Sequence, residues 1–176
     1  MAGILKVDKY QDFNGNDIMT SDGAGNITIN NAALKNTPAF SVYLTSATTL
    51  TNNTLTKVSF DTENYDTNNA VSSGTFTVPA GQAGKYFIYA QLSIGCTSQS
   101  SAWIYKNGSI VTFNIHQTSG NYLSDVSTNV SASLDLNVSD YIEIYARATS
   151  SGTPTLNGGG ASNQRCTFLG YKLIGA

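Results

Sequence analysis

The sequence carries little charge of either sign. Only 11% of its 176 residues are charged, and 9 Lys and Arg against 11 Asp and Glu leave a formal net charge of -2. No run of basic residues is present, so the electrostatic footprint of a nucleic-acid-binding protein is missing. Nucleic acid is therefore excluded as an expected partner.

The N-terminal segment lacks a long apolar run. Its only apolar stretch contains Lys6, Asp8 and Lys9, so it has neither the apolar core of a signal peptide nor the length of a membrane span. We expect synthesis in a cytoplasm and no insertion into a membrane.

Cysteine, histidine and glutamate are scarce. Cys96 and Cys166 could pair, but in a chain without an export signal free, buried thiols are favoured. His116 is the only histidine, and Glu63 and Glu143 are the only glutamates. A catalytic triad, a zinc site and a pair of catalytic carboxylates each need several such side chains close together, and these residues are few and far apart in the sequence. We expect no catalytic residues and no enzyme.

One stretch concentrates carboxylates, DTENYD, with Asp61, Glu63 and Asp66. Hard oxygen ligands close together in a loop can hold calcium. The alternative, a solvated loop in which Asp61 caps a turn, is favoured. Apart from this calcium candidate, no cofactor is predicted.

Helical periodicity is almost absent, and alternation of apolar and polar residues takes its place. Residues 126–138 and 141–149 alternate most clearly, as half-buried strands do. Turn residues every ten or so positions predict a β-sandwich or jelly roll, and residues 150–163 are expected to form a flexible surface loop. The predicted strands lie near residues 39–44, 55–60, 74–78, 84–95, 102–106, 109–117, 126–138, 141–149 and 164–174.

The strand predicted at 84–95 has bulky groups on both faces. Tyr86, Ile88, Ala90, Leu92 and Ile94 make one face, whereas Phe87 and Tyr89 begin the other. Since a strand at a wet surface shows one polar face, this pattern predicts that something covers both sides.

Residues 1–37 differ from the rest of the chain. They predict strands and a hairpin around residues 22–26, with too few apolar groups for a core of their own. We expect an N-terminal β arm at 1–37 that needs a neighbour, followed by the main domain at 38–176.

The main domain resembles the C1q and tumour-necrosis-factor-like jelly rolls. The order and spacing of several motifs carry the resemblance, which implies an all-β, ten-stranded jelly-roll sandwich that forms a homotrimer. No collagen-like Gly-x-y stalk precedes the domain, which argues against an animal complement-type protein. The matching stretches are PAFSVYL (38–44), KVSFD (57–61), YDTNNAVSSGTFTVPAGQAGKYFIYAQL (65–92), YKNGS (105–109), VSASLDLNVSDYIEIYA (130–146) and FLGYKLI (168–174).

Trimers of this family bury one sheet of each subunit against its neighbours. The resemblance therefore implies that Phe87, Tyr89, Phe168 and Tyr171 belong to the trimer interface. The alternative is that half of these side chains point into the sandwich, because a register error of one residue exchanges the two faces.

The N-terminal arm is similar to the openings of small virion proteins of tailed bacteriophages. The LKVD strand and the DGAGNIT hairpin carry this resemblance. It implies that the arm attaches the domain to the particle through other virion proteins, such as capsid or tail proteins. The candidate anchoring residues are Ile4, Leu5, Val7, Tyr10, Ile18, Ile27 and Ile29.

Three functional hypotheses result. The first is a virion protein, assembled in the host cytoplasm, that acts as a capsid decoration protein, head fibre or knob or, alternatively, as a receptor-binding tail fibre or tail tip. Loops near 95–101, 119–125 and 150–163 would suit contacts with a host cell-surface glycan. The second is a secreted C1q-like binding module, and the third, a glycan hydrolase, ranks last.

Overall fold

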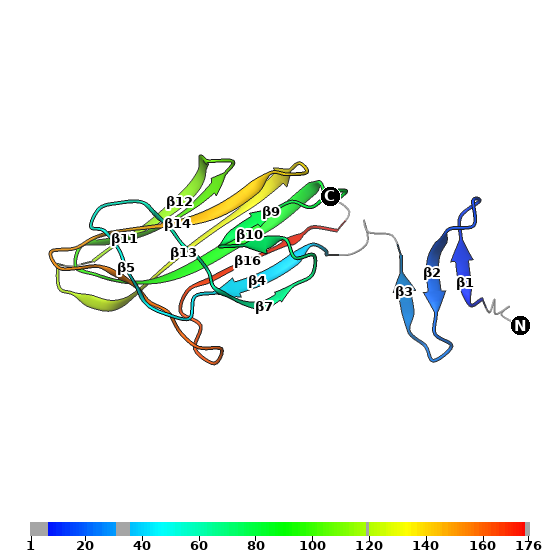
Figure 1. Ribbon diagram of the computed structural model, residues 1–176, viewed down its shortest axis with the longest axis horizontal. Helices are drawn as coiled ribbons and strands as arrows, with labels where there is room; N and C mark the ends of the chain where they lie inside the picture. Colours follow the sequence, from blue (N-terminus) through cyan, green and yellow to red (C-terminus); the bar gives the residue numbers. More distant parts are fainter. Residues whose placement is uncertain (1–6, 31–35, 119, 175–176) are drawn as a thin grey trace, which may run out of the picture. The chain divides into compact units, whose positions relative to one another are not determined.

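The computed structural model describes residues 7–30, 36–118 and 120–174. Within these ranges the chain forms strands and turns and no helix (Figure 1). The chain forms two compact units, one of the residues before Thr37 and after Leu173 and one of Thr37–Leu173, and each is described by itself.

The first unit is a three-stranded antiparallel meander of β1 (Lys9–Gln11), β2 (Asp17–Ser21) and β3 (Ile27–Ile29). The hairpin predicted around residues 22–26 is confirmed, since it joins β2 to β3. The hairpin agrees with the alternation of apolar and polar residues in its two strands and with the Gly and Asp residues of the turn between them.

The two turns of this meander share one motif, Asp-x-x-Gly-Asn, in which Asp12 and Asp22 are equivalent. The Asp12 carboxylate accepts hydrogen bonds from the Asn14 and Asn16 amides, both at 2.9 Å, and from Asn16 Nδ2 at 2.9 Å. Asp22 accepts the equivalent bonds from residues 24 and 26. The side-chain hydrogen bond from the asparagine is the main cause that lowers the pKa of each aspartate.

The second unit is a sandwich of two sheets (Figure 1). The first sheet has the order β5-β15-β10-β16-β4-β7, and β13 pairs with the other side of β10. The second has the order β12-β11-β14-β9-β8, with β6 beside β14. In the described part of this unit there are thirteen strands rather than ten, and four of them have only two residues.

The strand bounds of this unit are β4 (Ala39–Tyr43), β5 (Thr48–Thr49), β6 (Thr56–Lys57), β7 (Thr62–Asp66), β8 (Val71–Ser72), β9 (Thr75–Thr77), β10 (Gly84–Cys96), β11 (Gln99–Lys106), β12 (Ser109–Gln117), β13 (Leu123–Leu136), β14 (Tyr141–Thr149), β15 (Thr155–Leu156) and β16 (Thr167–Lys172).

The core lies between the two sheets and centres on β10. The five inward side chains of this strand, predicted from alternation, are all 0% exposed. They pack with inward side chains of β11 and β14, such as Ile104 and Ile144, which are equally buried. The Phe40 ring stacks on Phe76 with centroids 4.6 Å apart, so aromatic packing reinforces the area burial at one end of the core.

Phe168, predicted to lie at the trimer interface, is instead a core residue. It pairs with Ala90 across β16 and β10, is 0% exposed and packs edge-on against Phe40 with centroids 4.8 Å apart. The prediction was wrong because every bulky residue of the stretch FLGY is apolar. The stretch therefore does not show whether its even-numbered or its odd-numbered side chains point into the core. Gly170 is the other inward position, where a Cβ would lie 2.8 Å from Phe40 and Ile88 atoms.

The segment 150–163, predicted as a flexible surface loop, is partly built into the sandwich. Pro154 and Leu156 are buried, and β15 pairs with both β10 and β5. A Cβ on Gly158 would collide with the Ser46 backbone, and one on Gly159 with the Asn163 carbonyl. These two glycines permit close approach of the chain rather than mobility.

We predict that Phe168→Ala lowers the free energy of unfolding by about 3–5 kcal/mol, because it removes a ring from a packed core. Val138 is 44% exposed, so Val138→Ala is the control and should change the free energy by less than about 0.5 kcal/mol. Urea unfolding measures both. Equal, small effects of the two substitutions would contradict the inward position of Phe168.

Asp140 gives the domain a defined acid sensitivity. Its carboxylate accepts hydrogen bonds from Asn107 Nδ2 at 2.7 Å and from the Asn137 amide at 2.8 Å, and it pairs with Lys106 Nζ at 2.9 Å. The Asn107 side chain, then Lys106 and the Asn137 amide, lower the pKa of Asp140 to about 2.

Because the pKa of Asp140 is depressed in the folded state, its contribution to stability is present above the unfolded value of about 4 and is lost as the pH falls towards 2. We expect the difference in free energy of unfolding between the native chain and Asp140→Asn to be largest above about pH 4 and to shrink below it. Urea titrations at a series of pH values test this. A difference that stays constant down to pH 2 would contradict the assignment.

Candidate functional site

The outer face of the first sheet carries a cluster of aromatic and aliphatic side chains. We call the cluster formed by Phe87 and Tyr89 of β10 and Leu169 and Tyr171 of β16 the β10–β16 face. Phe87 lies opposite Tyr171 with ring centroids 5.6 Å apart, and Tyr89 lies opposite Leu169. All four side chains are partly buried, so they form a surface rather than a core.

Small residues flank these bulky groups on both sides. On β13, Ser133 and Ser131 lie opposite Phe87 and Tyr89. On β4, Ala39 and Ser41 lie opposite Tyr171 and Leu169. The larger side chains therefore stand above their neighbours and are accessible from the flanks.

The two central cross-strand rows of the β10–β16 face contain no charged side chain, and the row that adjoins Phe87 on one side pairs Lys85 with Asp135. The cross-strand row through Phe87 and the row through Tyr89, which ends at Tyr65 on β7, contain only apolar and hydroxyl residues. The next row, through Gln91, adds amide and hydroxyl groups and Tyr43. Such a surface loses little electrostatic solvation when another protein covers it.

Three of the four sequence-predicted interface residues, Phe87, Tyr89 and Tyr171, thus lie together. Phe168 does not, and Leu169 takes the outward position beside it. Leu169 and Tyr65 were missed by the sequence reasoning. The register of β16 against β10 places Leu169, and the register of β7 against β4 places Tyr65; both are set by pairing rather than by local sequence.

The arm has an apolar sheet face of its own. Tyr10, Met19 and Ile29 form one cross-strand row, and Tyr10, Met19 and Ile27 are 56%, 37% and 65% exposed. A hollow of about 90 Å³ lies here, lined by Val7, Asp8, Lys9, Tyr10, Met19, Thr20, Ser21 and Ile27.

The predicted anchoring residues divide between the two sides of this small sheet. Val7, Tyr10 and Ile27 line the hollow, and Ile29 shares a cross-strand row with Met19. Ile18 directly precedes Met19 in β2, so its side chain points to the opposite face of the sheet. Ile4 and Leu5 lie outside the described residues.

The three calcium candidates are not brought together. The segment is strand β7 rather than a loop, with Asp61 and Asp66 towards opposite ends. Asp61 accepts hydrogen bonds from Thr45 N at 3.0 Å and Thr45 Oγ1 at 2.7 Å, and Asp66 accepts one from the Val71 amide at 2.7 Å. Burial raises the pKa of Asp61, but the Thr45 bonds outweigh it and lower the pKa overall. Within the described ranges no three His, Cys, Asp or Glu side chains gather as a metal site.

The predicted thiol state is confirmed, because Cys96 and Cys166 are both free and buried. Burial raises the pKa of Cys166 to about 11, so its thiol stays protonated at neutral pH. The 95–101 segment, expected as a glycan-contacting loop, is mostly the ends of β10 and β11, and Cys96, Ser100 and Ser101 are 0% exposed.

A second aromatic surface, on the outer face of the second sheet, was also missed. It contains Trp103 and Tyr105 of β11, Phe113 of β12 and Tyr145 of β14. The stretch QSSAWIYK of β11 does not alternate clearly in polarity, so alternation does not indicate which of its side chains point outward.

Comparison with known proteins identifies the fold. No family model matches the chain, and no curated protein matches it. Among solved structures, the globular domain of zebrafish complement 1qA protein is similar, with a TM-score of 0.54 and 18% identity over 77% of this chain and 97% of that chain. Murine APRIL, of the tumour-necrosis-factor family, has a TM-score of 0.53 and 15% identity over 77% of this chain and 98% of that one.

These similarities confirm the expected C1q and tumour-necrosis-factor-like jelly-roll fold of the main domain. At such identities they establish the fold alone. The part of the chain that the structure describes contains no helix long and apolar enough to cross a membrane.

Proposed function

We propose that this chain is a structural protein of a tailed-bacteriophage virion. In this proposal the jelly-roll domain forms a homotrimer that is displayed on the particle, and the N-terminal arm attaches it to other virion proteins. The protein is assembled in the host cytoplasm, has no enzymatic activity and serves as a capsid decoration protein, head fibre or knob.

The observation that carries the proposal is the β10–β16 face, whose two central cross-strand rows carry no charged side chain. Phe87, Tyr89, Leu169 and Tyr171 are bulky, aligned in two cross-strand rows and flanked by small residues. Aromatic groups with few charges are typical of the buried centre of a protein interface. The resemblance to trimeric jelly rolls supports a second and third copy of this chain as the partners that cover the face.

The arm supports the attachment role. The arm's strands have only three to five residues, so the sheet buries little apolar surface of its own, and its Tyr10, Met19 and Ile27 side chains remain substantially exposed. Phe13, at the tip of the first turn, is 104% exposed. Contact with another virion protein would bury these groups, and the similarity of the LKVD and DGAGNIT stretches to phage virion proteins favours that kind of partner.

A receptor-binding tail fibre or tail tip is the second candidate, because the same trimer could contact the host. The secreted C1q-like module is the third. Immunogold labelling of purified particles distinguishes these locations, since it separates label on the capsid from label on the tail and from no label at all.

We predict that Tyr89→Lys converts the trimer to monomers at micromolar concentration, because it places a charge in the centre of the interface without touching the core. Light scattering measures the mass. Thr77→Lys, at an exposed position of β9 in the second sheet, is the control and should leave the trimer intact. A native chain that is monomeric at this concentration would refute the trimer.

We also predict that Tyr10→Ser combined with Ile27→Ser reduces co-sedimentation of the full chain with particles that lack it by roughly tenfold or more, since each change removes an anchor-type apolar contact. Thr28→Ala changes an exposed position of β3 that does not line the hollow, and serves as the control. If the serine variant joins particles as well as the native chain does, the arm is not the attachment device.

A further inference from the structure

The outer face of the second sheet holds an ordered aromatic cluster that the proposed trimer does not use. Trp103 stands at its centre, with Phe113 of β12 stacked on it at a centroid distance of 4.1 Å and an interplanar angle of 22°. The Arg147 guanidinium of β14 lies over the same ring, 5.4 Å from its centroid. We call Trp103, Phe113, Arg147 and the adjacent Tyr105 and Tyr145 the platform.

Hydrogen bonds hold Trp103 in one orientation. Its Nε1 donates to Ser101 Oγ at 2.9 Å, and the Ser101 hydroxyl donates to the Arg147 carbonyl at 3.0 Å. Both β11 and β14 are interior strands of their sheet. The platform is therefore rigid before any ligand arrives, which lowers the entropic cost of binding.

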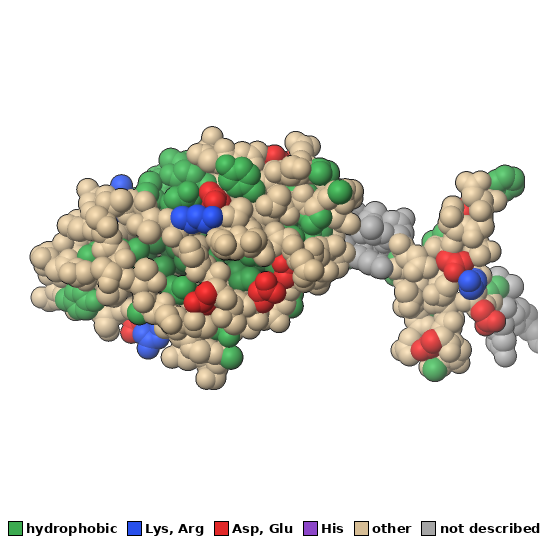
Figure 2. Space-filling model, in the orientation of Figure 1, with side chains coloured by type: hydrophobic (Ala, Val, Ile, Leu, Met, Phe, Trp, Pro, Cys, Tyr) green, Lys and Arg blue, Asp and Glu red, His purple; other side chains and the backbone are tan. Residues whose placement is uncertain are grey.

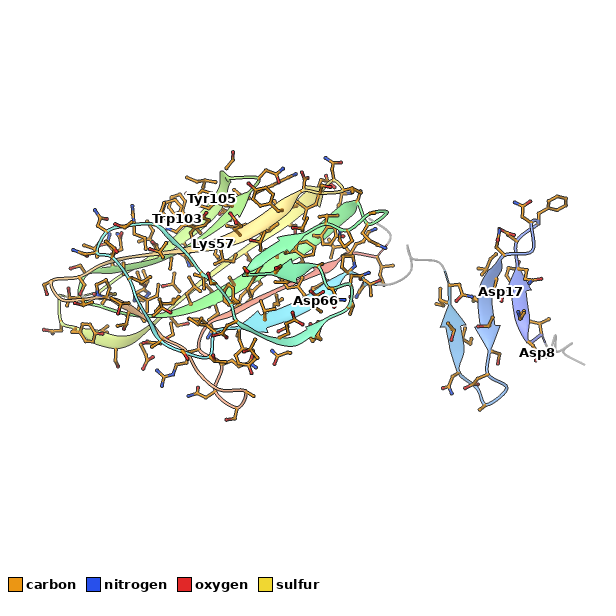
Figure 3. The ribbon with its side chains drawn as sticks, in the orientation of Figure 1. Asp8, Asp17, Lys57, Asp66, Trp103 and Tyr105 are labelled. Atoms are coloured by element: carbon orange, nitrogen blue, oxygen red, sulfur yellow. The ribbon has the colours of Figure 1, made fainter. Side chains whose placement is uncertain are left out.

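The second aromatic pair lies beside a neutralised ion pair. Tyr105 and Tyr145 have centroids 4.5 Å apart, and Tyr145 donates to Glu143 at 3.3 Å. Lys57 Nζ lies 2.8 Å from Glu143, so these two charges cancel. Figure 3 shows Lys57, Trp103 and Tyr105 close together over this sheet, and Figure 2 shows hydrophobic side chains next to a lysine or arginine and an acidic side chain in the same region.

Arg147 remains as the uncompensated charge of the platform. Among the described residues no carboxylate lies within ion-pair distance of it, and its one side-chain partner is Gln99 Oε1 at 3.4 Å. Its Nε is buried and has no hydrogen-bond partner there. The platform thus combines aromatic rings with one positive charge, which is complementary to an anion that also has apolar surface.

The exposed area of the platform favours a small ligand. Phe113 is 49% exposed, but Trp103 is only 8% exposed, and Tyr105 and Tyr145 are partly buried. A stable protein interface needs roughly 800 Å² from each partner, more than a few partly covered rings supply.

We propose that the platform binds a carboxylate-bearing saccharide. The sugar ring would pack its C–H face on Phe113 and Tyr105, and its carboxylate would accept hydrogen bonds from Arg147. Lys57, Thr75 and the tyrosine hydroxyls would meet the sugar hydroxyls at the other end. As a role in host contact, this inference rests on the proposed display of the domain on a virion, whereas the binding itself does not require it.

The test is a fluorescence titration of the purified full chain, because Trp103 is the only tryptophan and lies inside the proposed site. The probes are 3′-sialyllactose and trigalacturonic acid, with lactose as the neutral counterpart. We expect a saturable change of Trp103 emission with at least one acidic probe, and binding of lactose weaker by roughly tenfold or more, since a charge-assisted bond is lost.

Substitutions then locate the site. Arg147→Gln should remove the preference for the acidic probe, and Phe113→Ser should weaken binding by roughly tenfold, a loss typical of removing a ring contact. Val138, 44% exposed between β13 and β14, is close to Phe113 in exposure and belongs to neither proposed surface, so Val138→Ser is the control and should bind as the native chain does. Circular dichroism confirms that each variant is folded.

Several results would overturn the inference. They are no saturable change with either acidic probe, equal binding of lactose, equal weakening by Val138→Ser, or tighter binding of a glutamate-rich peptide, which would assign the platform to an acidic protein segment. Repeating the titration with Tyr89→Lys separates this inference from the trimer, because a monomer that still binds the acidic probe retains the site after self-association has failed.

Discussion

The constraint on which the rest of the domain depends is that β10 buries its inner face and pairs at both of its edges. Its inward side chains are inaccessible to solvent, and its edges pair with β13 along nearly the whole strand and with β16 and β15 on the other side. Because side chains alternate, these pairings decide which residues of the neighbouring strands point inward. Phe168 enters the core and Tyr171 faces outward for this reason alone. The candidate interface is thus a consequence of the same register that builds the core.

Alternation predicted the inner face of β10 although its outer face is also bulky, since the five side chains assigned to the inner face are all buried. The order of the family-type motifs indicated the jelly roll that the solved structures confirm. Two-residue strands such as β5 and β15 could not be predicted, since they exist only through pairing with distant segments.

The candidate sites were harder to predict because β11 and β16 carry apolar side chains on both faces. FLGY offers Phe168 and Leu169 equally to the core, and only the pairing of Ala90 with Phe168 decides between them. The outward position of the platform residues could not be predicted from alternation for the same reason. The carboxylates of β7 were misjudged in another way, since their partners, such as Thr45 for Asp61, lie outside the motif.

The repeated turn of the arm has a consequence for how this segment could vary in length. Asp12 and Asp22 head equivalent turns ten residues apart, and each turn satisfies its own carboxylate locally. One strand and its turn therefore form a ten-residue segment whose hydrogen bonds are local. Duplication of this segment could lengthen the sheet without disturbing the strand pairs already present. One added unit would reverse the direction in which the chain leaves the antiparallel sheet, whereas two would restore it. Spacer length in such arms should thus change most easily in even numbers of units.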